Sequence, residues 1–263
     1  IIVGFIYFGG IALSMGVLSF YLIKKILDVN DPLVIVNSFL IFWFLFDLLS
    51  RFFFQQLPVL NIKPYLILPF KRHQIIKYLL IRTGVSFFNI LPLLFFVPFS
   101  IVLLVEGYSV IGVITWYLAM LSLVYTNNFL NFLINKTNSY FYGILALTAS
   151  FALLEIYDIF KITNYADGFF SAFYNQPYLV VIPIALLYIS YKLVYTYIRN
   201  HFYVDGAISK KEEKISKRDF NWLDQFGKIG FFLKNDLKLI TRNVRPRQVV
   251  LTSFMFLFYG LLF

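Results

Sequence analysis

The sequence predicts an all-α fold, a polytopic bundle of transmembrane helices, on three observations. Hydrophobic residues make up 60% of the chain and charged residues 14%, whereas soluble domains carry about 25% charge. The mean hydropathy is +0.78. Apolar runs near the length of about 20 residues that a helix needs to cross a bilayer alternate with short polar breaks. Such continuous runs indicate helices, because transmembrane β-strands would be shorter and alternate in polarity.

Six apolar runs precede residue 199, and we expect each to form one membrane span. They are residues 1–23, 33–50, 83–105, 109–133, 139–154 and 178–197. Pro92 and Pro98 are expected to kink the third span. The stretch 155–177 is expected to be a polar loop. A seventh run starts at Gln248, and we interpret 248–263 as the start of a further span in a longer protein.

The basic residues predict the orientation of the spans. The break 51–82 contains Lys and Arg but no acid, and the segment after the sixth run is strongly basic. The alternate breaks are neutral or acidic. Because Lys and Arg concentrate on the cytoplasmic side, we expect a multi-pass protein of the bacterial inner membrane with its N-terminal side in the cytoplasm. Topology thus accounts for the net charge of +10 without nucleic acid as a partner.

Several chemistries are excluded by residue content. The chain has no cysteine, and its two histidines, His73 and His201, both lie beside basic residues. It has no glycine-rich loop followed by Lys-Ser or Lys-Thr, and no zinc-protease or serine-hydrolase motif. We therefore expect no catalytic residue, no metal and no cofactor in this chain.

The first candidate site is the basic stretch 63–78 in the break between the second and third runs. Pro69 is suited to the start of a helix, and basic side chains follow it. The residues of interest are Pro69, Lys71, Arg72, His73 and Lys77. They form either a contact surface for a partner subunit or a loop that is basic only because it faces the cytoplasm.

The second candidate is the segment 219–242, in which apolar residues recur at steps of three and four. This spacing predicts a basic amphipathic helix that lies on the membrane surface and contacts lipid. Its apolar face includes Trp222, Phe226, Leu233 and Leu237. The simplest interpretation is a juxtamembrane anchor for anionic lipid.

Polar residues inside the runs form a third candidate. Asn127, Asn131 and Asn135 share one helical face, with Asn128 beside them. These amides either bond across helices or line a translocation path. Asp47, four residues before Arg51, is either half of a local ion pair or an acid of functional importance inside the membrane.

The six-run layout, the Leu-Pro-x-x-basic stretch at 68–72 and the amphipathic helix before the seventh run together resemble the type-2 ABC exporter permeases. The chain also resembles a permease-like membrane family of Bacteroidota with two such halves in one chain. The resemblance implies a separate ABC ATPase subunit that contacts the stretch around Pro69, and transport by alternating access. It also implies an interfacial elbow helix at 219–242.

On this interpretation the chain has three regions. Residues 1–198 form a six-helix transmembrane half, 199–247 a cytoplasmic basic linker with the elbow-like helix, and 248–263 the first span of a second half. Two other functions stay open. One is an intramembrane enzyme acting on lipid-linked substrates, for which Glu155, Asp158 and Asp167 are the available acids. The other is a membrane scaffold that transports nothing.

Overall fold

The computed structural model describes residues 2–26, 31–55, 71–135, 138–201 and 220–242, together with residues 250 and 253. The chain forms two compact units, Ile1–Gly206 and Ala207–Phe263, and each is described by itself. Pro69 and nearly all of the expected seventh span lie outside the described residues.

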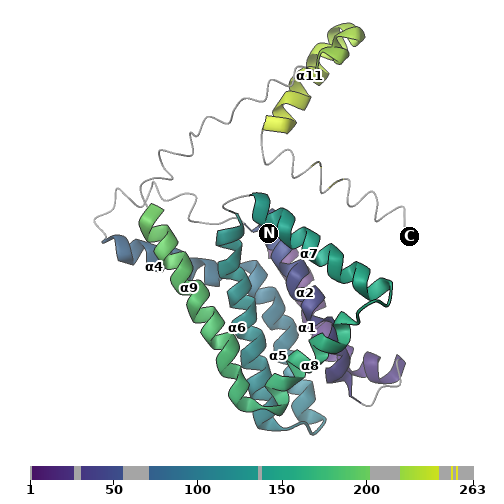
Figure 1. Ribbon diagram of the computed structural model, residues 1–263, viewed down its shortest axis with the longest axis vertical. Coiled ribbons are helices and arrows are strands. Elements are labelled where there is room, and N and C mark those ends of the chain that lie inside the picture. The colour runs from purple at the N-terminus through teal and green to yellow at the C-terminus, as the bar shows by residue number, and fades with distance from the viewer. Residues whose placement is uncertain are drawn as a thin grey trace. The chain divides into compact units, whose positions relative to one another are not determined.

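All regular elements in the described ranges of the first unit are helices, which confirms the predicted all-α bundle (Figure 1). Its elements are α1 (Ile2–Ile26), α2 (Pro32–Phe54), α4 (Arg72–Gly84), α5 (Phe87–Val105), α6 (Val110–Ile134), α7 (Asn138–Ile156), α8 (Ile162–Asn175), the 3-10 turn η2 (Pro177–Val180) and α9 (Val181–His201).

Within the described ranges, five helical segments are long and apolar enough to cross a membrane. They are Ile6–Ile26, Pro32–Phe54, Phe87–Val105, Val110–Ile134 and Pro177–Asn200. They correspond to five of the six predicted spans, and the protein is a multi-pass membrane protein. The apolar segment Tyr140–Ile156 within α7 corresponds to the remaining predicted span, but it is shorter than the other five and belongs to the apolar helices of 10–17 residues.

The expected polar loop at 155–177 is wrong, because most of this stretch forms helix α8. Ile162, Ala166, Phe170 and Phe173 recur at steps of four and three and are all buried. This narrow apolar face packs α8 against α2 and α6. Glu155, near the end of α7, accepts hydrogen bonds from the backbone N–H and the hydroxyl of Thr163. The Glu155 carboxylate thus caps the first turn of α8.

The structure also differs from the prediction at the start of the third run. Residues 83 and 84 belong to α4 and not to α5. The chain turns at Val85 and Ser86 before α5 begins. The Asn89 amide donates to the carbonyl oxygens of Thr83 and Gly84, at 3.0 Å each. These bonds satisfy carbonyls that the end of a helix leaves without partners.

Helix α6 lies at the centre of the packing, and half of its most apolar stretch is buried. It contributes Trp116 and Met120 to a core shared with α1, α2, α5 and α8. At its other end, Phe129 and Phe132 join a core shared with α4 and α9. α1 packs mainly on α5, and Gly16 makes this approach close: a Cβ there would lie 2.5 Å from the Phe95 carbonyl oxygen.

The second unit contains a 3-10 helix, η3 (Asn221–Phe226), followed by α11 (Gly227–Arg242). The sequence predicts one continuous helix here, and the structure breaks it at Gly227, whose φ is +57°. Gly230 allows η3 to fold back on α11, because a Cβ at Gly230 would overlap the Leu223 carbonyl oxygen.

Candidate functional site

A buried polar network links α2 to its neighbours near the C-terminal end of α2, and its centre is Arg51. The Arg51 side chain is fully buried and its Nε donates to Asp47 Oδ2 at 2.7 Å. Its Nη1 donates to Asn89 Oδ1 at 2.8 Å, and its Nη2 donates to the Phe88 carbonyl at 2.7 Å. The pair is therefore more than a local ion pair on one helix, since the same guanidinium bonds to α5.

The asparagines of α6 complete this network from the other side. Asn127 donates to Asp47 Oδ2 at 3.0 Å and to the Phe44 carbonyl at 2.9 Å. Asn128 accepts from Gln55 Nε2 at 2.8 Å and donates to Thr83 Oγ1 at 3.3 Å. Asn131 donates to Gln55 Oε1 at 3.0 Å.

The network joins four helices, α2, α4, α5 and α6, through side chains that are at least nine-tenths buried. In an apolar environment each such group must find a partner, because an unpaired charge or amide carries a large desolvation penalty. Sequence reasoning found the aspartate–arginine pair and the asparagine stripe separately. It missed Gln55, Thr83 and Asn89. Gln55 continues the four-residue spacing of Asp47 and Arg51, and this spacing could have indicated it.

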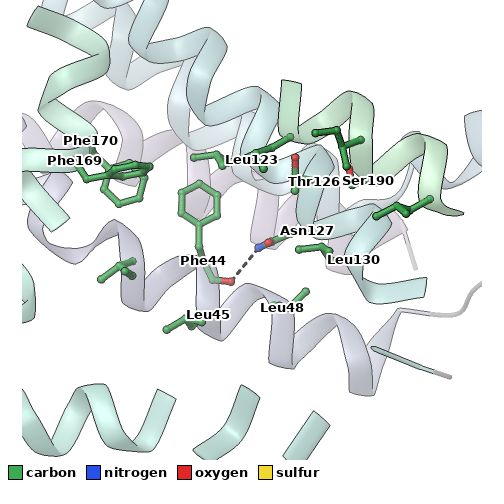
Figure 2. A pocket seen from close by; sticks show the side chains of 14 residues that line it. Phe44, Leu45, Leu48, Leu123, Thr126, Asn127, Leu130, Phe169, Phe170 and Ser190 are labelled. Carbon is green, nitrogen blue, oxygen red and sulfur yellow. Dashed lines mark hydrogen bonds between the residues drawn. The ribbon is translucent and has the colours of Figure 1, made fainter. Parts of the chain in front are cut away.

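A cavity of about 480 Å³ lies beside the network, between α2, α6, α8 and α9 (Figure 2). Most of its lining is apolar, and the polar members are Thr126, Asn127 and Ser190. Figure 2 shows Asn127 bonded to the Phe44 carbonyl, with Phe169 and Phe170 at one end of the cavity. Asn127 thus belongs both to the cavity wall and to the polar network.

The described part of the predicted basic stretch 63–78 consists of Lys71 and the first half of helix α4, and its basic side chains are exposed. Ile75, Ile76, Leu79 and Leu80 are buried against Phe129 and Phe132 of α6 and Val194 and Ile198 of α9. Lys71, Arg72, His73 and Lys77 are exposed. Arg72 and His73 line a second cavity with residues of α9, and Lys71 and Lys77 do not.

In the second unit, the residues predicted to form the apolar face of the elbow-like helix differ in their exposure. Trp222, Phe226 and Leu233 are exposed, and Leu237 is half-buried. Lys234 of α11 binds the Asp224 carboxylate of η3 at 3.1 Å, which holds the two helices together.

The acids available to an intramembrane enzyme have structural partners. Glu155 caps α8, Asp158 pairs with Lys161 at 3.3 Å, and Asp167 accepts a hydrogen bond from Ser171 at 2.6 Å. Among the described residues, no group of three or more His, Cys, Asp and Glu side chains is placed to hold a metal ion.

Comparison with known proteins gives a family and no activity. Residues 1–263 match the family described as "Family of unknown function (DUF5687)". The chain belongs to this family. It has no significant match among curated proteins or among solved structures.

Proposed function

We propose that this chain is the membrane-spanning permease subunit of an ATP-driven exporter of the ABC type. A separate ATPase subunit binds Lys71 and Lys77 at the exposed start of α4 and drives alternating access. The protein lies in the bacterial inner membrane with its N-terminal side in the cytoplasm, as the basic residues of the break 51–82 favour.

The observation that carries this proposal is the arrangement of α4. A loop that was basic only for topology would not need a fixed conformation. Here the apolar side of a 13-residue helix is buried in the bundle while Lys71 and Lys77 remain exposed. Such a helix presents a positively charged surface in a fixed position. This surface is complementary in charge to an acidic patch on a soluble partner.

The polar network supports a transmission role for α4. Thr83 in its last turn bonds to Asn128 of α6 and, through its carbonyl, to Asn89 of α5. Asn89 in turn binds Arg51 of α2. A displacement of α4 by the ATPase would therefore act on three spans through hydrogen bonds, and contiguous networks of this kind can carry coupling between distant sites.

The cavity beside Asn127 supports an apolar or amphipathic substrate. Its volume of about 480 Å³ is in the range of small-molecule sites, and its lining suits hydrocarbon with one or two polar groups.

The elbow-like helix supports a second permease half in the same chain. On this proposal α11 lies in the membrane interface ahead of the next span.

Co-purification tests the proposal. The full-length protein is crosslinked in its native membranes and isolated, and P-loop ATPases in the eluate are identified by mass spectrometry. We expect one ATPase to co-purify stoichiometrically, and to be lost from the double variant Lys71→Glu/Lys77→Glu. Lys25→Glu/Lys161→Glu, which changes exposed lysines in α1 and before α8, is the matched control and should retain it.

Isolation of the full-length protein without any ATPase would contradict the transporter proposal. Retention of the ATPase by the α4 variant would exclude α4 as the contact.

A further inference from the structure

The second cavity lies between the start of α4 and the end of α9 and has a volume of about 540 Å³. Its lining consists of Arg72, His73, Ile76, Tyr195, Arg199 and Asn200. Two guanidinium groups and an imidazole thus surround one hollow, and none of its six lining residues is acidic. This is the charge pattern of an anion site.

The two arginines belong to helices that are held in a fixed relationship. Ile76 and Leu79 of α4 and Val194 and Ile198 of α9 are 2% exposed or less and form one core. Arg72 and Arg199 lie close along the chain to these buried residues. The separation of their backbone positions is therefore set by packing, and an anion between them does not have to order two flexible segments.

The depth of the cavity indicates the source of the anion. α9 supplies the candidate span Pro177–Asn200, so Arg199 and Asn200 are the last two residues of the membrane-crossing segment. Lipid phosphates lie at this boundary between hydrocarbon and water. The half-buried Tyr195 ring provides apolar surface in the same cavity, which a lipid chain can contact and a free ion does not need.

We propose that this cavity binds the phosphate of an anionic phospholipid. Arg72 and Arg199 bind the phosphate oxygens, since guanidinium groups match phosphate in geometry as well as charge. Tyr195 and Asn200 supply neutral hydrogen-bond donors to the headgroup. This inference does not rest on the proposed function, because Lys71 and Lys77, the residues assigned to the ATPase, do not line the cavity.

Native mass spectrometry and thermal unfolding of the purified full-length protein test the proposal. The probes are phosphatidylglycerol, zwitterionic phosphatidylcholine and inorganic phosphate. We expect phosphatidylglycerol to remain bound and to raise the melting temperature, and Arg72→Gln and Arg199→Gln each to weaken its binding at least tenfold. Lys192→Gln, on the same α9 helix but outside the cavity, should bind it as the wild type does.

Arg199→Lys keeps the charge but loses the planar fork, and should fall between the wild type and Arg199→Gln. Three results would overturn the proposal. One is equal phosphatidylglycerol affinity in Arg72→Gln, Arg199→Gln and wild type. Another is equal protection by phosphatidylcholine. The third is full protection by inorganic phosphate alone, which would assign the cavity to a soluble ion.

Discussion

Arg51 of α2 donates from Nη1 to Oδ1 of Asn89 in α5 at 2.8 Å, and both side chains are fully buried. The same asparagine amide donates to the last carbonyls of α4. Asn89 thus joins the arginine of one span to the end of another helix.

We expect Asn89→Leu to lower the free energy of unfolding by about 3 kcal/mol, because it leaves a buried guanidinium short of an acceptor and two carbonyls without a donor. The measurement is reversible unfolding of the full-length protein in mixed micelles. Asn135→Leu is the control, since Asn135 is exposed and, in the described part of the chain, its side chain bonds to Asn131 one turn earlier. It should cost less than about 1 kcal/mol. Similar losses for both variants would show that the Arg51 contact contributes little.

A double-mutant cycle tests the ion pair of Asp47 and Arg51. Arg51→Leu alone should destabilise by about 3–5 kcal/mol, because it strands a buried carboxylate. Asp47→Leu/Arg51→Leu should be less destabilised than Arg51→Leu, although Asn89 and Phe88 still lose their donor. The expected coupling is about 2 kcal/mol. Additive losses in the same unfolding assay would mean that the two side chains act independently.

Gly16→Ala should destabilise the protein by about 1–3 kcal/mol. Its new Cβ would lie 2.5 Å from the Phe95 carbonyl oxygen and 2.6 Å from Pro98 Cγ, and neither atom can move easily. Gly10→Ala is the matched control on the same helix, because nothing lies within 4 Å of that Cβ position. It should change the stability by less than about 0.5 kcal/mol. A neutral Gly16→Ala would mean that α1 shifts freely on α5.

Interfacial placement of α11 can be tested with a fluorescent label, because the chain has no native cysteine. An environment-sensitive dye on Leu233→Cys should shift to shorter wavelength when the full-length protein is reconstituted into vesicles. The same dye on Asn235→Cys should report water, because residues 233 and 235 lie on opposite sides of an α-helix. Equal spectra at the two positions would contradict a membrane-bound α11.

The spans were predictable because lipid leaves the backbone no partner outside its own segment. The run 33–50 contains most of α2 (Pro32–Phe54), and the run 109–133 nearly coincides with α6 (Val110–Ile134). Helix α8 was missed because its apolar face is narrow and polar residues such as Asn164 and Asp167 separate its members. A short amphipathic helix of this kind looks like a loop when only the average polarity is considered.

The candidate site was predictable in pieces and not as a whole. Asp47 and Arg51 are four residues apart on one helix, and so are Asn127 and Asn131. Each pair can therefore be recognised without knowing how the helices pack. That Asn127 bonds to Asp47, 80 residues earlier, depends on which faces of α2 and α6 meet. The sequence around Asn89 does not indicate the hydrogen bonds that this residue makes, because they depend on the turn between α4 and α5.

The interposition of α8 has a consequence for the order in which the bundle assembles. α7 packs chiefly on α2 and α9 on α6, so these successive apolar helices have their main partners elsewhere in the chain. In the folded bundle they therefore do not form a self-contained hairpin. The last span of this unit packs chiefly on a helix that precedes α7 and α8 in the chain, so α9 makes its main contacts only after both of those helices have been synthesised.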